Sequence, residues 1–377
     1  MRIFFLLTLL FATQTISMAA APVEIPFGRE SALVSTEFTG GVTERRCEAR
    51  IWRDEANFHV VLRSEHGALA HKANALNGHD DPVFRDDCIE IFLDVEGRGK
   101  SYYQVVANVN GAIYDHWRDE YRRSSVRWDS DAVAKGRYGA DFYEIEVAIP
   151  LASLNLGNNP SGEIALAIGT HVRYNKDNRI TWGQYHQPQT WKRFTLSGSY
   201  PVALDSWEGS EAAGKQSYTF ALKNTSGRDL SLTGTFNGRK IAMELPAGEI
   251  RKLTEATVHT TDEPTEHRLL LNDGTREVLH FVRKFTPHPL LYAVPASVLL
   301  FKDDPIRIHG SLREEPSEPL EVVLHSPSGS TVKKVPLSGR RFSIDLHDEQ
   351  ADSIDCRYKG ESLRFKLERI ASPWSPR

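Results

Sequence analysis

The sequence predicts an all-β protein, in which an antiparallel N-terminal β-sandwich precedes two smaller β-sandwiches. The first observation is the alternation of apolar and polar side chains in residues 89–94, 103–109 and 143–149, which is typical of half-buried strands. The second is the near absence of helical periodicity, because only residues 151–156 have the spacing of a helical turn. Frequent short strands without intervening helices favour antiparallel sandwiches over α/β folds.

The alternation also predicts which side chains point away from the hydrophobic core. In residues 89–94, Glu90 lies on the opposite face from the isoleucines and leucine, because successive side chains of a strand point to opposite sides. In residues 103–109, Gln104 and Asn108 do the same. A sheet face that presents a carboxylate, amides and an aromatic ring suits a hydroxyl-rich ligand.

Strand and turn signals divide the chain into three β-units after the N-terminal leader. The first covers residues 22–204, and its further predicted strands are residues 47–52, 58–63, 164–173 and 191–196. The second covers residues 205–286 and is of immunoglobulin-like size. It contains Asn237-Gly238 between alternating segments, the strongest short hairpin signal. Residues 287–377 form the third unit, again with short β-patterned segments.

Residues 1–21 have the pattern of a secretory signal peptide. Arg2 is followed by an apolar run over residues 3–12 and by small residues up to Ala21, and this run is too short for a membrane-spanning helix. We therefore expect an exported protein, periplasmic or extracellular. The formal net charge of −4 includes no basic block, so nucleic-acid binding has no electrostatic support.

The chain has three cysteines, too few for a disulfide scaffold. Cys47 and Cys88 both lie in predicted strands of the first unit, where they form either a disulfide or two buried thiols. Cys356 stands alone in the third unit.

The first unit resembles family 9 carbohydrate-binding modules and their wider DOMON-like superfamily of jelly-roll-like sandwiches. The similarity lies in the order and spacing of several segments over about 170 residues, namely residues 86–94, 102–105, 108–115 and 143–150 with the late tryptophans Trp182 and Trp191. The C-terminal units have no part in it.

This resemblance implies a sugar clamped between two aromatic rings and bound by a carboxylate, amides and an arginine. Glu90 would supply the carboxylate and Asn108 an amide, and Phe84 stands where the family has tryptophan. The second ring is either Trp182 or Trp191. The expected arginine is absent from the central strand, and Arg173 is a candidate replacement. In the absence of the resemblance, Glu90 is equally well interpreted as a solvated strand residue.

We expect a secreted, non-catalytic protein that binds a polysaccharide or oligosaccharide and assists carbohydrate catabolism, with C-terminal units that meet protein partners. One alternative is a haem-binding DOMON-like domain for electron transfer, although residues 22–204 contain no methionine to ligate haem. The other is a structural or adhesion protein of the cell envelope without a sugar site. No hydrolase, metalloprotease or phosphate-binding motif supports an enzyme.

No cofactor is expected, and calcium is the candidate metal. Asp94 and Glu96 lie in a glycine-containing loop, Asp94-Val95-Glu96-Gly97-Arg98-Gly99, that resembles a calcium loop. Arg98 stands where a further carboxylate would favour the ion.

Overall fold

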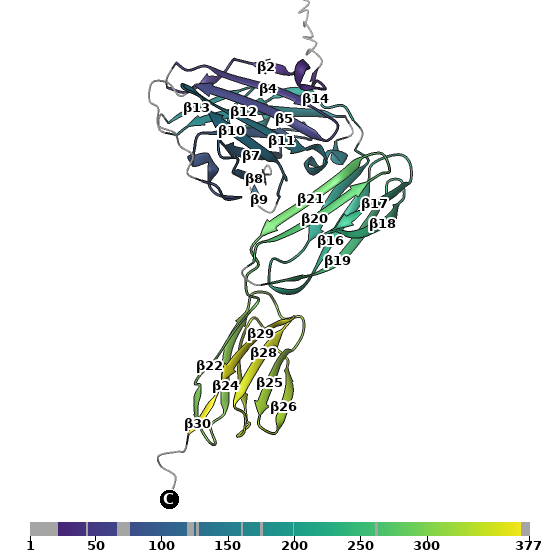
Figure 1. Ribbon diagram of the computed structural model, residues 1–377. Helices are drawn as coiled ribbons and strands as arrows, with labels where there is room; N and C mark the ends of the chain where they lie inside the picture. Colours follow the sequence, from purple (N-terminus) through teal and green to yellow (C-terminus); the bar gives the residue numbers. More distant parts are fainter. Residues whose placement is uncertain are drawn as a thin grey trace, which may run out of the picture.

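The computed structural model describes residues 22–370, apart from 43, 66–75, 119–123, 126–127, 160, 174–175, 199 and 261–262. The predicted signal peptide lies outside the described residues. Among these residues the chain forms strands β1 to β30 and five short 3-10 helices. The all-β prediction is confirmed, and three sandwiches follow one another with the second between the other two (Figure 1).

The first sandwich consists of two sheets, here called sheet A and sheet B. In sheet A the strand order is β1 (Val23–Glu24), β14 (Lys192–Thr195), β12 (Glu163–Val172), β6 (Cys88–Asp94), β7 (Tyr102–Asn108), β8 (Ile113–Arg118) and β9 (Ser124–Ser125), with β13 (Asp177–Thr181) on β12 and β3 (Thr39–Gly40) on β13. In sheet B it is β10 (Val133–Tyr138), β11 (Phe142–Pro150), β5 (Asn57–Glu65), β4 (Cys47–Arg53) and β2 (Leu33–Ser35).

The core of this sandwich lies between the two sheets and contains the apolar half of each alternating strand. Ile89 and Ile91 from sheet A and Ile145 and Val147 from sheet B are fully buried there. Burial of each such side chain contributes roughly 1.5–3 kcal/mol. Tyr143 spans the two sheets, since its hydroxyl donates to the carbonyl of Cys88 at 3.1 Å. The position of the core therefore follows from the alternation in the sequence.

The outward faces of the two sheets differ. Over sheet A lie the 3-10 helix η2 (Val83–Arg85) and the segment 185–191, which includes η5 (Pro188–Thr190). On the outward face of sheet B, Glu144 pairs with Arg137 at 2.8 Å. The remaining 3-10 helices, at the ends of strands, are η1 (Arg29–Ser31), η3 (Leu151–Leu154) and η4 (Leu156–Asn158).

The second sandwich pairs a three-stranded with a four-stranded sheet. The first contains β15 (Val202–Glu208), β16 (Gly214–Asn224) and β19 (Ile250–His259), and the second β18 (Arg239–Leu245), β17 (Leu230–Phe236), β20 (Thr265–Asn272) and β21 (Glu277–Phe285). The predicted hairpin joins β17 and β18, and Asn237 and Gly238 have φ of 50° and 78°, as the tight hairpin turn requires.

The third sandwich contains three small sheets around its own apolar core. Its strands are β22 (Leu291–Pro295), β24 (Ile306–Leu312) and β27 (Arg341–Leu346), then β23 (Leu299–Phe301) with β30 (Glu368–Ile370), and finally β26 (Gly329–Val335), β25 (Leu320–Ser326), β28 (Ser353–Tyr358) and β29 (Glu361–Lys366).

Charged side chains join the first and second sandwiches. Asp129 accepts hydrogen bonds from Arg283 Nη1 at 3.0 Å and from the Lys284 backbone amide at 2.7 Å. Asp131 accepts one from Arg268 Nη2 at 3.0 Å. Because the Asp129–Arg283 pair is almost fully buried, loss of one partner would leave an uncompensated charge.

The three cysteines are free, buried thiols. Cys47 lies in sheet B and Cys88 in sheet A, so the alternative of two unpaired thiols is the one observed. No helix within the described ranges is long and apolar enough to cross a membrane.

Candidate functional site

Glu90 lies on the outward face of sheet A, opposite Val106 of β7 and Gly169 of β12. Only 9% of it is exposed. Its Oε2 accepts a 2.7 Å hydrogen bond from Gln104 Nε2. Burial raises the pKa of the carboxyl to about 7, although the hydrogen bond from Gln104 acts in the opposite direction. Near neutral pH the carboxyl is therefore present in two forms. The protonated form donates and accepts hydrogen bonds, and the ionised form only accepts them.

Three further polar side chains continue from Glu90 across β7 and β8, and we call the set of Glu90, Gln104, His116 and Arg118 the polar strip. Gln104 is directly opposite His116 in the register, and Tyr102 is opposite Arg118. Directly opposed side chains are about 5 Å apart. Strand register thus places four hydrogen-bonding groups side by side on one face.

Several atoms of the polar strip are buried but lack a hydrogen-bond partner within the described residues. They are both ring nitrogens of His116, Oε1 of Gln104 and Nε of Arg118. Buried polar atoms are normally paired, and each unpaired one costs about 1–3 kcal/mol. Burial lowers the pKa of His116 to about 4, with a smaller effect of Arg118, so its neutral ring offers one donor and one acceptor.

Aromatic rings lie at one end of the polar strip, around η2. Phe84 is 39% exposed and meets Tyr114 edge-on, with ring centroids 5.6 Å apart. Tyr114 is opposite Val106, which is itself opposite Glu90. Tyr114 is therefore in the same cross-strand row as the carboxylate, and Phe84 contacts it from η2.

A second aromatic group packs at the other end of the strip. It comprises Phe92, Tyr102, Trp191, Tyr185 and His186. The Tyr102 hydroxyl and His186 Nδ1 are 2.8 Å apart. Gly169, opposite Glu90, makes room for this group, since a Cβ there would lie only 2.6 Å from the ring of Tyr185.

The two late tryptophans lie on different sides of sheet A. Trp191 is on the outward face but only 5% exposed, and its Nε1 donates to the Gln184 carbonyl at 2.7 Å. Trp182 packs against the sandwich core, with its ring 5.1 Å from that of Phe194. It follows β13 in a left-handed backbone conformation, φ 64°, which interrupts the alternation. Tyr185 and His186, between the two, approach the strip instead.

Asn108 and Arg173 are both outside the polar strip. Asn108 is fully buried; its amide donates to the Asp86 carboxylate at 2.9 Å and its Oδ1 accepts from the Ala112 amide at 3.0 Å. It therefore holds the turn between β7 and β8. Arg173 follows β12, where its backbone amide donates to Asp87 at 2.9 Å. Arg118 is the arginine that the structure places beside the strip.

Asp94 and Glu96, the predicted calcium ligands, have other contacts. Asp94 is fully buried and accepts hydrogen bonds from the backbone amides of Glu96 at 3.1 Å and Gly99 at 2.6 Å. Glu96 pairs with Arg98 at 3.7 Å. Backbone amides thus donate to both carboxylate oxygens of Asp94 in this structure.

Sequence reasoning did not identify Tyr114, His116 or Arg118 as members of the site. The alternation of β8 could have identified them, because these three residues alternate with Ile113, Asp115 and Trp117 and so share one face of the strand. Tyr185 and His186 had no periodic signal, since they lie in an irregular segment that reaches the sheet only through the tertiary fold.

No family model matches the chain, and no curated protein does. A Bacteroides uniformis protein described as carbohydrate-binding is similar to 43% of this chain over 87% of its own, with 13% identity and a TM-score of 0.34. A family 9 module from Caldicellulosiruptor kristjanssonii, in complex with cellotriose, is similar to 47% of this chain over 93% of its own, with 14% identity and a TM-score of 0.31. At these scores the similarities carry no argument about function.

Proposed function

We propose that the outward face of sheet A binds a carbohydrate, with the polar strip as its hydrogen-bonding surface. The observation that supports this most is the set of buried, unpartnered polar atoms on Gln104, His116 and Arg118. Hydroxyl groups of a ligand would satisfy them, because a hydroxyl donates and accepts. Glu90 completes the set with a carboxyl that exchanges both roles near neutral pH.

The aromatic groups at the two ends suit the remaining surface of a sugar ring. A pyranose has an apolar C–H face that an aromatic ring covers and a polar rim that amide and carboxyl groups bind. Phe84, as the exposed ring, is the proposed stacking platform. Tyr185 and His186 are the proposed contacts at the opposite end. Arg118 takes the role that the sequence suggested for Arg173.

Affinity should be modest. Each hydrogen bond contributes about 1 kcal/mol net, and a phenylalanine platform offers less surface than a tryptophan. Dissociation constants between micromolar and millimolar are expected. The proposed role is that of a secreted protein that binds the polysaccharide while other proteins break it down, without catalysis by this chain.

A glycan array followed by calorimetric titration of the full chain with the best oligosaccharide tests this proposal. Cellulose and xylan oligosaccharides are the first candidates. Glu90→Gln should lower affinity about tenfold or more, because it replaces one carboxyl oxygen with an NH2 group that cannot accept a hydrogen bond. Glu146→Gln, on the outward face of sheet B, is the matched control and should bind as wild type does.

Two outcomes would reject the proposal. If no sugar binds, or if Glu90→Gln and Glu146→Gln bind equally well, the polar strip is not a sugar site. A Soret band in the absorbance spectrum of the purified protein would instead support the haem alternative.

A further inference from the structure

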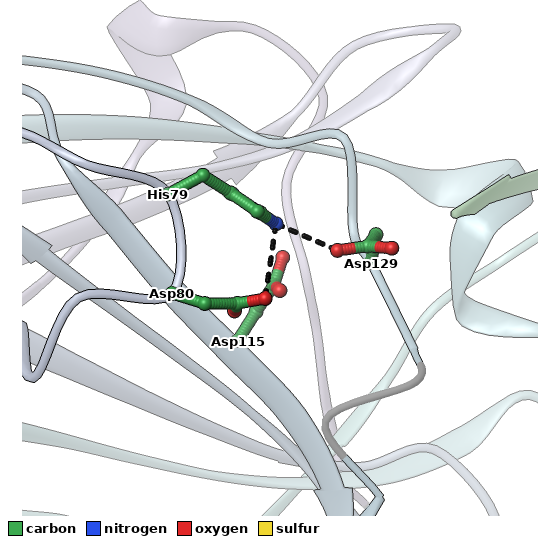
Figure 2. A group of neighbouring side chains, drawn as sticks. All are labelled: His79, Asp80, Asp115 and Asp129. Carbon is green, nitrogen blue, oxygen red and sulfur yellow. Dashed lines mark hydrogen bonds and ion pairs between the residues drawn. The ribbon is translucent and has the colours of Figure 1, made fainter. Parts of the chain in front are cut away.

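A second group of titratable side chains lies beside the junction with the second sandwich. Figure 2 shows His79, Asp80, Asp115 and Asp129 pointing toward one another. Each offers a ligand atom within 4.8 Å of the others. His79 Nε2 is 2.6 Å from Asp129 Oδ1 and 3.6 Å from Asp80 Oδ2. The four residues come from three separate segments, so their proximity is produced by the fold.

Asp115 has an unsatisfied oxygen in this group. The residue is fully buried, and its Oδ2 accepts hydrogen bonds from the backbone amide and the hydroxyl of Ser130. Its Oδ1 is buried and has no hydrogen-bond partner in the described part of the chain. Oδ1 of Asp80 is also buried and has no partner there. A buried carboxylate oxygen without a donor is stabilised either by a proton or by a positively charged partner such as a metal ion.

Positive charge near the group does not balance its three carboxylates. Arg283 donates to Asp129 Oδ2 at 3.0 Å but also pairs with Glu211 at 2.7 Å, so its charge is shared. Lys284 reaches Asp129 through its backbone amide. His79 is the remaining basic side chain of the group.

We propose that His79, Asp80, Asp115 and Asp129 bind a divalent transition-metal ion of the zinc or manganese type. One imidazole nitrogen and three carboxylate oxygens form a mixed donor set. Imidazole ligands favour Zn²⁺ and other transition ions, whereas Ca²⁺ and Mg²⁺ prefer oxygen ligands alone. The unpartnered oxygens of Asp80 and Asp115 would then face the ion.

The ion would connect three parts of the molecule. Asp80 lies in the segment that leads into η2 and Phe84. Asp115 lies between Tyr114 and His116 in β8. Asp129 is hydrogen-bonded to the second sandwich. Ion binding should therefore hold both the sugar-facing aromatic residues and the junction in place. The expected effect on sugar affinity rests on the proposed function, but the proposal of ion binding does not.

Calorimetric titration of the EDTA-treated full chain with Zn²⁺, Mn²⁺, Ca²⁺ and Mg²⁺ tests the proposal. We expect one equivalent of Zn²⁺ or Mn²⁺ to bind more tightly than Ca²⁺ or Mg²⁺. At 100 times Kd, the ion should raise the unfolding temperature of the first sandwich by roughly 5 °C.

Asp115→Asn and His79→Gln should each weaken binding by about tenfold or more, with Glu146→Gln as the control that binds normally. Asp115→Asn preserves shape and an acceptor for Ser130, and His79→Gln keeps the buried carboxylates, so one of the two should fold if the other does not. Circular dichroism checks this.

Absence of saturable binding, tighter binding of Ca²⁺ or Mg²⁺, or wild-type affinity in both folded variants would overturn the metal site. If ion binding is found but no sugar binds, the metal site stands and the sugar proposal fails. If sugar binds but the ion does not, the sugar proposal stands and the metal site fails.

Discussion

Two strands of the first sandwich share a three-residue pattern but have different surroundings. Residues 89–91 of β6 and 145–147 of β11 each place a glutamate between two buried aliphatic residues. Glu146 pairs with Lys135 and Arg29, each at 3.4 Å, on the solvated face of sheet B. Glu90 is buried and has Gln104 as its hydrogen-bond donor.

The comparison shows that alternation determines which residues face the core but does not determine what lies over the other face. The glutamates on the outward face of sheet B contact solvent and pair with nearby basic side chains. Sheet A has η2 and the segment 185–191 over it. An identical pattern therefore yields an ordinary surface in one sheet and a candidate binding surface in the other.

The largest expected difference between the two glutamates is in the pH dependence of stability. Because the pKa of Glu90 is about 7 in the folded protein and 4.5 when unperturbed, its contribution is fully present below pH 4.5. It is lost as the pH rises through 7. The free energy of unfolding should therefore fall by about 3 kcal/mol over this range from Glu90 alone. Cys88 and Tyr185, which face it, have raised pKa values and stay neutral.

Denaturant unfolding of Glu90→Gln and Glu146→Gln between pH 4 and 8.5 measures this difference. Relative to wild type, Glu90→Gln should gain stability as the pH rises, whereas the difference for Glu146→Gln should stay nearly constant. A constant difference for both variants would show that Glu90 is as solvated as Glu146.

Gly169→Ala tests whether the segment 185–191 lies tightly on sheet A. The new Cβ would lie 2.6 Å from the ring of Tyr185, so that ring or the strand must move. We expect a loss of about 1–3 kcal/mol in the free energy of unfolding, with weaker sugar binding. Thermal unfolding measures the first and calorimetry the second. Unchanged values of both would indicate that the segment is open in solution.

His116→Leu should change the free energy of unfolding and the sugar affinity in opposite directions. Both ring nitrogens lack partners within the described ranges, so an apolar side chain of similar size removes a desolvation cost of about 1 kcal/mol. The variant should be slightly more stable than wild type in chemical denaturation but bind sugar several-fold more weakly. A clear loss of stability would mean that the imidazole is satisfied in solution.

The smallest expected effect is that of Phe84→Trp. A larger exposed ring stacks on more of the sugar, and aromatic contacts of this kind contribute about 0.5–1 kcal/mol. Affinity should increase roughly two- to fivefold, as measured by calorimetry. An unchanged Kd would place the stacking contact elsewhere.

Much of the fold could be predicted from local patterns. Strict alternation predicted the core side chains of β6, β7 and β11, and Asn237-Gly238 predicted a hairpin because few residues accept positive φ at both turn positions. These features depend on neighbouring residues in the chain.

The site was predictable only in part, because its composition depends on long-range pairing. Glu90 and the outward position of Gln104 follow from alternation, but the opposition of Gln104 and His116 requires the register of β7 with β8. Asn108 faces outward too, yet Asp86 and the turn after β7 occupy its amide. The side on which Trp182 lies is set by one left-handed residue, which no periodicity predicts.

A crystal structure of the full chain with its best oligosaccharide would show directly whether the polar strip binds sugar. We expect sugar hydroxyls within hydrogen-bond distance of Glu90, Gln104 and His116, with the ring of Phe84 over a C–H face. Sugar density elsewhere, with only water beside these three side chains, would contradict it.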